Sequence, residues 1–306
     1  MTISRTILLC GALVVVAHAG VRAQNVIGFV SFRFGNFEIF SMALDGGNQV
    51  RLTNHPGDDK EPCWSPDGSK IVFTSFRDRN YEIYVLGAEG GDPLRLTDDA
   101  AADDFPAWTP DGRTISFHSN RGGELGIYLM DADGRNVRLL AVPTERSAIG
   151  GKWSPDGSTI AYHAIGDGVR DIFALDVASG EAVNLSRNPS DDIMGAWSPD
   201  GSRIVFHSVR DGNSEIYAMD ADGGNPRRLT DDPGEDRNPA WSADGAEIVF
   251  DAVRGGVRDI YIMDADGGRV RNLSDDLGDD FCPVWIPGAR THVGGRSWGL
   301  VKAQTR

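Results

Sequence analysis

The chain has 306 residues and a mass of 33.0 kDa, enough for one large domain or two ordinary ones. Apolar residues make up 40% and charged residues 25%, a globular composition that excludes wholesale disorder. The net charge of −15 repels phosphate backbones and anionic lipid surfaces, so we expect no nucleic-acid partner.

Residues 1–23 have the pattern of a secretory signal peptide. Arg5 precedes an apolar run over residues 7–17, and residues 17–19 and 21–23 each offer small residues for cleavage. The run is too short to cross a bilayer, and no later stretch approaches 18 apolar residues, so we predict no membrane span. Cleavage after Ala23 would remove two arginines and give a mature charge of −17. We therefore expect a periplasmic or extracellular protein.

The rest of the chain repeats one unit of about 44 residues. Tryptophan recurs at spacings of 44, 45, 44, 44 and 44 residues, at Trp64, Trp108, Trp153, Trp197, Trp241 and Trp285. An aromatic residue follows the first five tryptophans by 20 residues, at Tyr84, Tyr128, Phe173, Tyr217 and Tyr261. We interpret both sets as structural residues that pack the units together, rather than as platforms for carbohydrate.

Each unit predicts four short strands separated by turns. In the first complete unit, the tryptophan strand is followed by a Ser-Pro-Asp-Gly turn at 65–68, which suits a tight turn because proline presets φ and glycine accepts a positive φ. Strands are then expected over 71–73, 82–84 and 94–97. Four short strands per repeat of this length are typical of a β-propeller blade.

The two ends of the chain predict how the ring closes. Phe40 and Leu52 stand where strands three and four of a blade would place them, but the tryptophan strand of that blade is missing. Trp285 supplies such a strand and little follows it. We therefore predict an all-β, six-bladed propeller over residues 26–287, with four antiparallel strands per blade and a C-terminal strand that completes the N-terminal blade.

The unit at 197–230 reads Trp-Ser-Pro-Asp-Gly, Ile-Val-Phe-His-Ser, Arg-Asp-Gly-Asn-Ser-Glu-Ile-Tyr, Asp-Ala-Asp-Gly-Gly and Arg-Arg-Leu-Thr. This pattern, present in all six units, resembles the repeat of the TolB-like six-bladed β-propellers. The resemblance implies a periplasmic or secreted propeller that binds a protein. TolB itself carries an α/β domain before its propeller, and in this sequence we expect only the signal peptide before the repeats.

Acidic residues gather in the loops that connect strand four to the next strand one. These loops share a face, here called the top face, with the loops between strands two and three. We predict that the top face binds a protein or peptide, with a basic one among the candidates, through Asp58, Asp59, Asp103, Asp104, Asp191, Asp192, Glu235, Asp236, Asp279 and Asp280. The alternative is that these acids only cap turns and face water.

Arginine recurs at matching offsets in the loops between strands two and three, at Arg33, Arg77, Arg121, Arg210 and Arg254, whereas the fourth blade has Gly166. We predict structural ion pairs across a short turn. The expected partners are Glu38, Glu82, Glu124, Glu215 and Asp259.

His118, His163 and His207 occupy one second-strand position in three consecutive blades. Equivalent positions of neighbouring blades are too far apart for zinc, whose bonds to nitrogen are about 2 Å long. We expect each histidine to be buried and bonded to a loop carboxylate or carbonyl. No cofactor is predicted, and calcium at the acidic loops remains an alternative.

The chain carries no Gly-x-Ser-x-Gly or His-Glu-x-x-His motif. We therefore favour a non-catalytic propeller, expected to be monomeric. The alternatives are a channel-located hydrolase or lyase acting on a carbohydrate or peptide through carboxylates, and a calcium-binding envelope component.

Two features are left open by the sequence. Cys63 and Cys282 fall on neighbouring first strands and could form a disulfide in an oxidising compartment. Residues 288–306 form a polar tail with four basic residues and no acids, whose role the pattern does not indicate.

Overall fold

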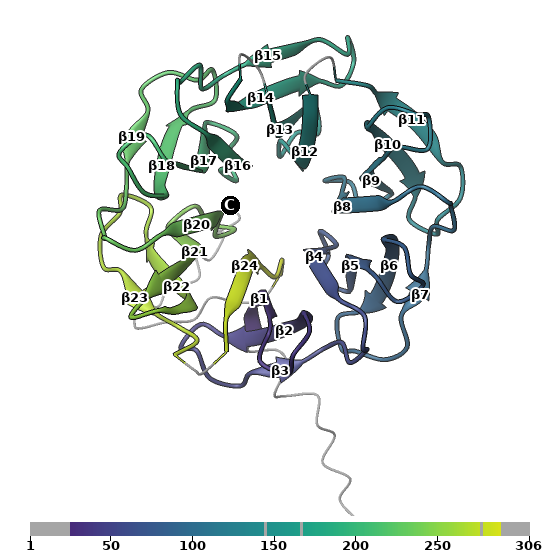
Figure 1. Cartoon of the computed structure of the whole chain (residues 1–306), viewed down its shortest axis with the longest axis horizontal. Helices are drawn as coiled ribbons and strands as arrows, with labels where there is room; N and C mark the ends of the chain where they lie inside the picture. The colour runs from purple at the N-terminus through teal and green to yellow at the C-terminus, as the bar shows by residue number, and fades with distance from the viewer. Residues whose placement is uncertain (1–24, 144–145, 166–167, 276–277, 289–306) are drawn as a thin grey trace, which may run out of the picture.

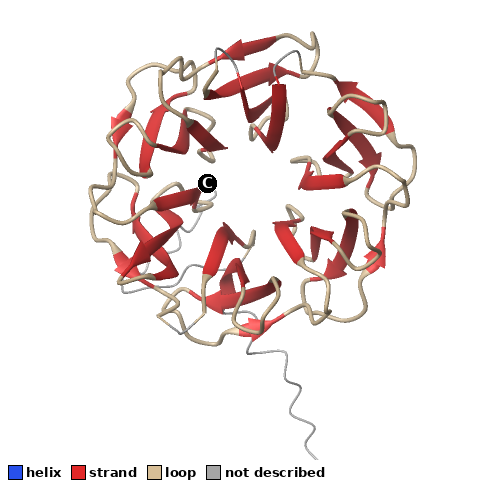
Figure 2. Cartoon of the chain, viewed as in Figure 1, coloured by secondary structure: helices blue, strands red, loops and turns tan. Residues whose placement is uncertain are grey.

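The computed structural model describes residues 25–143, 146–165, 168–275 and 278–288. These residues form six four-stranded antiparallel sheets arranged as blades around a central channel (Figures 1 and 2). The predicted six-bladed β-propeller is therefore confirmed. The signal peptide and all but the first residue of the tail lie outside the described residues. Among the described residues, no helix is long and apolar enough to span a membrane.

The blades are numbered from the N-terminus, and each runs outward from strand one to strand four. The first strands, nearest the channel, are β24 (Asp280–Trp285), β4 (Asp59–Trp64), β8 (Asp103–Trp108), β12 (Arg146–Trp153), β16 (Asp192–Trp197) and β20 (Asp236–Trp241). The second strands are β1 (Asn25–Ser31), β5 (Lys70–Ser75), β9 (Thr114–Ser119), β13 (Thr159–Ile165), β17 (Arg203–Ser208) and β21 (Glu247–Arg254).

The outer half of each blade follows the same order. The third strands are β2 (Glu38–Ala43), β6 (Glu82–Gly87), β10 (Gly126–Asp131), β14 (Arg170–Asp176), β18 (Glu215–Asp220) and β22 (Val257–Asp264). The fourth strands are β3 (Val50–Arg51), β7 (Leu94–Arg95), β11 (Arg138–Ala141), β15 (Ala182–Asn184), β19 (Arg227–Arg228) and β23 (Arg271–Asn272).

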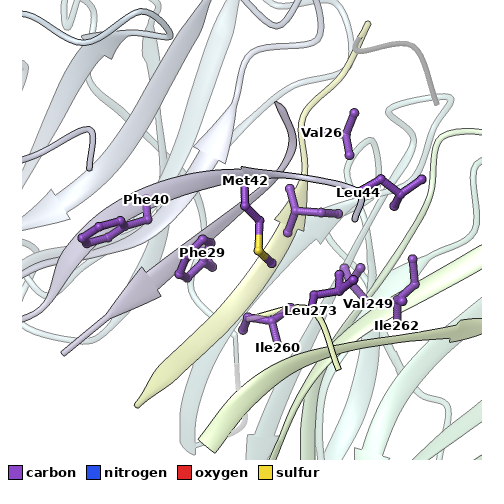
Figure 3. Close-up of a cluster of buried hydrophobic side chains, with 10 residues drawn as sticks. Val26, Phe29, Phe40, Met42, Leu44, Val249, Ile260, Ile262 and Leu273 are labelled. Atoms are coloured by element: carbon purple, nitrogen blue, oxygen red, sulfur yellow. The ribbon is translucent and has the colours of Figure 1, made fainter. Parts of the chain in front are cut away.

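Blade 1 is built from both ends of the propeller. Its strand order is β24-β1-β2-β3, and Trp285 of β24 lies opposite Ile27 of β1. The predicted closure by a C-terminal strand is therefore confirmed. Blades 1 and 6 share a buried apolar cluster in which Met42 and Leu44 pack with Ile260 and Ile262 (Figure 3).

The repeated aromatics pack both between blades and within a blade. Trp64, Trp108 and Trp241 are at most 7% exposed and join apolar clusters that include residues of the preceding blade. The aromatic of the third strand lies beside an aromatic of the second strand in the same blade, as Tyr84 does with Phe73 at 6.0 Å between ring centroids. Trp153 also donates a hydrogen bond of 2.9 Å from Nε1 to Ser116 Oγ of the preceding blade.

Each first strand contains a β-bulge three residues before its tryptophan. The register against the second strand shifts there in every blade. The bulged residue has a φ between 48° and 79°. These residues, here called the bulge ring, are Glu61, Phe105, Gly150, Met194, Asn238 and Cys282. Five of them are not glycine, so the ring holds side chains in a conformation that L-residues adopt at a cost of about 1–2 kcal/mol each.

Candidate functional site

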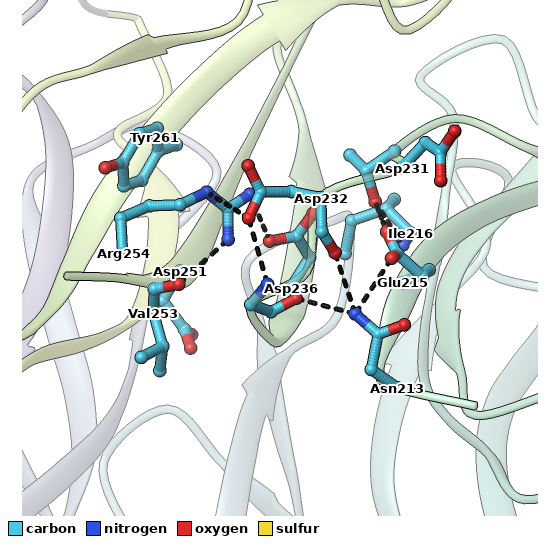
Figure 4. Close-up of polar contacts among 12 residues, drawn as sticks. Asn213, Glu215, Ile216, Asp231, Asp232, Asp236, Asp251, Val253, Arg254 and Tyr261 are labelled. Atoms are coloured by element: carbon cyan, nitrogen blue, oxygen red, sulfur yellow. Dashed lines mark hydrogen bonds and ion pairs between the residues drawn. The ribbon is translucent and has the colours of Figure 1, made fainter. Parts of the chain in front are cut away.

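The five top-face arginines all form ion pairs, but not with the predicted partners. Arg77 Nη2 lies 3.0 Å from Asp59 Oδ2, and the same pair recurs as Arg33–Asp280, Arg121–Asp103, Arg210–Asp192 and Arg254–Asp236 (the last in Figure 4). The prediction of structural ion pairs was correct in kind and wrong in partner. The arginine reaches the start of the first strand because that aspartate lies beside the end of the second strand.

These pairs change the charge map of the top face. Asp59, Asp103, Asp192, Asp236 and Asp280 are 0% exposed, so half of the ten acids predicted to contact a partner are buried structural residues. Burial raises the pKa of Asp236 to about 6, and only its Oδ1 is bonded to Arg254, at 2.6 Å. The fourth blade has Ala148 in place of the aspartate and Gly166 in place of the arginine, so both members of the pair are missing together.

The other five predicted acids lie on the surface or at the channel. Asp58, Asp191 and Glu235 are partly exposed and pair with Lys60, Arg170 and Arg258 at 3.3, 2.9 and 3.0 Å. Asp279 is exposed and accepts a hydrogen bond of 3.1 Å from the Arg258 backbone N–H. Asp104 instead lies beside Glu61, and its Oδ1 is 3.0 Å from Thr74 Oγ1.

The acids expected to pair with the arginines serve another set of contacts. Glu38, Glu82 and Glu215 are 0% exposed, and each contacts an arginine and a threonine of its own fourth-strand segment. The bond from Asn213 Nδ2 to Glu215, at 2.9 Å, belongs to this network (Figure 4). In these three blades, the arginine and the threonine of the Arg-Leu-Thr motif are therefore the partners of a buried glutamate.

The channel contains a cavity of about 310 Å³ that the bulge ring lines. Four tryptophans, Trp108, Trp153, Trp197 and Trp241, line it lower down. The repeat pattern alone does not indicate this cavity. A signal for it was present, because proline follows the bulge in four first strands, at Pro62, Pro106, Pro239 and Pro283.

A carboxyl pair lies in the channel wall between blades 2 and 3. Thr74 Oγ1 is 3.0 Å from both Glu61 Oε2 and Asp104 Oδ1, and the Phe105 backbone N–H donates to both carboxyl groups. Burial and the neighbouring Asp104 carboxyl raise the pKa of Glu61 well above its usual range. Glu61 therefore holds a proton more readily than an exposed glutamate does, which suits a general acid or base.

The three histidines are buried behind the bulge ring. The Gly151 N–H donates to His118 Nε2 at 3.4 Å, and the Asn238 N–H donates to His207 Nδ1 at 3.4 Å. His207 therefore accepts from the backbone of the next blade, in place of the predicted carboxylate or carbonyl partner. The Ala148 backbone also bonds to His118 in a way that favours its protonated form, as the predicted carbonyl would. Burial lowers the pKa of His118 to about 4 and that of His207 to about 3, so both are neutral acceptors at pH 7.

No cluster of three or more His, Cys, Asp or Glu side chains suited to a metal ion occurs among the described residues. Cys63 and Cys282 are free thiols. Burial raises the pKa of the Cys282 thiol. Because the thiolate is the reactive form, Cys282 is a poor nucleophile in this site.

The geometry defines a closed six-bladed propeller with a lined channel, and the sequence assigns its family. The TolB β-propeller domain family, PD40, matches residues 14–146 and 126–293. The chain therefore belongs to this family.

Solved structures share the fold. TolB from Acinetobacter baumannii is 23% identical with a TM-score of 0.77, over 86% of this chain and 67% of that one. Putative TolB from Agrobacterium tumefaciens is 24% identical with a TM-score of 0.68, over 86% and 99%. An oligogalacturonate lyase from Vibrio parahaemolyticus is 17% identical with a TM-score of 0.56, over 76% and 71%. No curated protein matches the sequence.

Proposed function

We propose that this chain is a TolB-type propeller of the cell envelope that binds a protein partner on the top face of blades 1 and 2. An exposed group of aromatic side chains on that surface carries the proposal. This aromatic patch consists of Phe32, Phe34, Phe37, Phe76, Tyr81 and Phe281. Phe34 is 60% exposed and Phe32 and Phe76 are each 42% exposed, although large apolar side chains are normally covered.

The patch is organised across two blades. Between ring centroids, Phe32 lies 4.9 Å from Phe37 in a tilted arrangement, and Phe37 lies 5.5 Å from Phe281 edge to face. Phe76 lies 4.9 Å from Tyr81, also tilted. Lys60 Nζ lies 4.6 Å from the Phe37 centroid and 5.6 Å from that of Tyr81, so it joins the two halves. Fixed aromatic side chains suit an interface because they bury much area and lose little entropy on binding.

The charge of the surface sets the expected chemistry of the partner. Asp58 and Asp279 precede the first strands of blades 2 and 1, and Asp98 of blade 2 is 86% exposed. A partner with an apolar anchor flanked by lysine or arginine would match both the patch and these acids. The signal-peptide pattern of residues 1–23 supports placement outside the cytoplasm.

The test compares three versions of the mature chain as bait in an extract of the parent cell's envelope. The patch variant carries Phe32→Ser, Phe34→Ser and Phe76→Ser, and the control carries Leu94→Ser and Val183→Ser on outer strands, where both side chains are exposed. The captured protein is then purified and its Kd measured. We expect at least about tenfold weaker binding by the patch variant and unchanged binding by the control. Equal binding by all three baits, or no specific capture, would refute the proposal.

The Glu61–Asp104 pair favours a second candidate, a hydrolase or lyase that works in the channel. A carboxyl group with a raised pKa in a lined cavity is a common feature of acid–base sites. The candidate predicts turnover in a screen of oligosaccharides and peptides, with loss of at least about 100-fold in Glu61→Gln. Absence of turnover by the folded wild type would leave the partner-binding proposal as the remaining one.

A further inference from the structure

We propose that the channel binds an organic anion through Lys152, with a carboxylate as the recognised group and an apolar body in the cavity. The site is distinct from the aromatic patch and does not depend on it. Lys152 is the residue immediately before the tryptophan in the first strand of blade 4, and it lines the cavity.

The position of Lys152 is otherwise apolar around the ring. The corresponding residues of the other five blades line the same cavity, and they are Cys63, Ala107, Ala196, Ala240 and Val284. One ammonium group therefore projects into a channel level that is formed by small apolar side chains. A neighbouring blade of ordinary sequence would place alanine there, so the lysine is a departure from the repeat rather than part of its structural pattern.

Blade 4 also makes room beside this lysine. Gly150 and Gly151 precede it, where blade 3 has Phe105 and Pro106. Gly150 has a φ of 79°, and a Cβ there would lie 3.1 Å from His163 Nδ1 and 3.2 Å from Met194 Sδ. The wall of blade 4 is thus built from backbone at two successive positions, and a larger residue at 150 would disturb the histidine behind it.

Within the part of the chain that the structure describes, the Lys152 ammonium group forms no ion pair with a carboxylate and donates no hydrogen bond. Blade 4 faces blade 1 across the channel (Figure 1). Burial, followed by the charges of Asp251 and Glu61, raises the pKa of the Cys282 thiol in blade 1, and the Lys152 charge opposes that rise across the channel.

An unpaired ammonium among apolar walls selects for a particular ligand. Coulombic attraction is stronger in such surroundings than in water, and an anion would complete the pair that the protein leaves open. The apolar walls favour a ligand with one charge and a hydrocarbon body, and a cavity of about 310 Å³ admits a small one. Either a free carboxylic acid or the C-terminal carboxylate of a peptide has this chemistry.

The acids near the channel do not cancel this selection. Burial raises the pKa of Glu61 well above its usual range, so this carboxyl group holds its proton more readily than an exposed one does. Charges at the exposed mouths are screened over about 8–10 Å at physiological ionic strength. An anion that reaches the cavity therefore meets one local cation.

The test uses the mature chain and two pairs of probes, with tryptophan fluorescence and calorimetry as readouts because four tryptophans line the cavity. The first pair is benzoate and its neutral isostere benzamide. The second is N-acetyl-Gly-Phe with a free carboxylate and the same peptide as its amide. We expect saturable binding of the acids and at least about tenfold weaker binding of each neutral analogue.

Matched variants assign the effect to Lys152. Lys152→Met keeps an unbranched side chain in an apolar wall and should fold, since removing an unpaired charge is not destabilising. It should lose at least about tenfold in benzoate affinity, while Lys70→Met, an exposed lysine on β5, should not. The patch variant should bind benzoate like the wild type. If the peptide acid binds at least about tenfold tighter than benzoate, the ligand is a chain terminus, and otherwise a small acid.

Three results would overturn the proposal. They are equal affinity for an acid and its neutral analogue, unchanged affinity in Lys152→Met, and no saturable binding of either acid by wild-type protein that is folded by circular dichroism. None of these outcomes affects the proposal for the aromatic patch, whose test is capture by the top face.

Discussion

At the scale of single residues, adjacent aspartates have opposite roles. Asp58 is partly exposed and pairs with Lys60, whereas Asp59 is 0% exposed and has both carboxylate oxygens 3.0–3.1 Å from Arg77 Nη2. The sequence alone treats them as one acidic cluster. The distinction comes from burial at the start of the first strand, which a residue count does not record.

The first prediction concerns this pair. Arg77→Met should lower the free energy of unfolding by about 3–5 kcal/mol, because it leaves Asp59 buried without a counter-charge. The double variant Asp59→Ala with Arg77→Met should cost less than Arg77→Met alone, as blade 4 lacks both members of the pair. Urea denaturation measures both values. A double variant less stable than the single one would contradict the argument.

The second prediction concerns Asp236 and pH. Its pKa in the folded chain is about 6 against an ordinary 3.8, because burial disfavours the charged carboxylate. Between these values the folded chain holds a proton that the unfolded chain has lost. Stability from this group is therefore fully present below about pH 4, and rising pH removes about 2–3 kcal/mol by pH 7.

Asp236→Asn isolates that contribution. The free energy of unfolding of the wild type should fall from pH 4 to pH 7 by about 2–3 kcal/mol more than that of the variant. Urea denaturation at both pH values gives the difference. Parallel pH profiles for the two proteins would show that Asp236 ionises as freely when folded as when unfolded.

At the scale of the blade, the third and fourth strands carry matched motifs. Glutamate at the start of the third strand occurs with Arg-Leu-Thr, as Glu215 does with residues 228–230. Aspartate at that position occurs with Asn-Leu-Ser. Asp259 accepts a bond of 2.8 Å from Asn272 Nδ2 and one of 3.3 Å from Ser274 Oγ. The shorter acid is thus matched by asparagine in place of the longer arginine. Asp171 repeats this arrangement in blade 4.

The third prediction tests this matching. Glu215→Asp should destabilise the chain by about 2–3 kcal/mol, because the shortened carboxylate loses contact with Arg228 and Thr230 while remaining buried. Adding Arg228→Asn and Thr230→Ser should restore most of that loss, since the blade then carries the motif of blade 6. Thermal and urea denaturation of the single and triple variants measure the loss and its recovery. A triple variant no more stable than the single one would refute the matching.

The ring of blades was predictable from the sequence, whereas the ion-pair partners of the arginines were not. Tryptophans such as Trp64 and Trp108 recur at a fixed spacing because each blade must pack against its neighbour, so the repeat indicates the ring. The partner of Arg77 was not predictable from proximity in sequence, because Asp59 becomes its neighbour only when β4 pairs with β5. The simultaneous absence of both residues in blade 4 was the available signal.

The sites in the channel could not be predicted from the sequence. Lys152 is unremarkable in the sequence, and its significance arises only when six first strands bring five apolar residues to the same level. Glu61 and Asp104 are 43 residues apart in sequence and meet at the interface of blades 2 and 3. Sites of this kind depend on the closed ring.

At the scale of the whole molecule, closure depends on β24. This strand covers the inner edge of β1 and brings Phe281 and Val284 into blade 1. Without it, β1 would present unpaired backbone groups next to exposed apolar side chains, which is the arrangement that promotes association between sheet edges. Burial of each large apolar side chain stabilises the fold by about 1.5–3 kcal/mol. Exposing several of these side chains would therefore cost nearly the whole free energy of unfolding of a domain.

The final prediction follows from that comparison. A chain ending at Asp279 should fail to form a cooperative monomer, and should aggregate or melt at least about 10 °C lower. A chain ending at Gly288 keeps β24 and should melt like the full-length protein, which separates the strand from the tail. Light scattering and calorimetry measure both, and a synthetic peptide of residues 278–288 should restore the melting temperature of the shorter chain. Should the shorter chain stay monomeric and melt like the longer one, closure by β24 would not be what stabilises the ring.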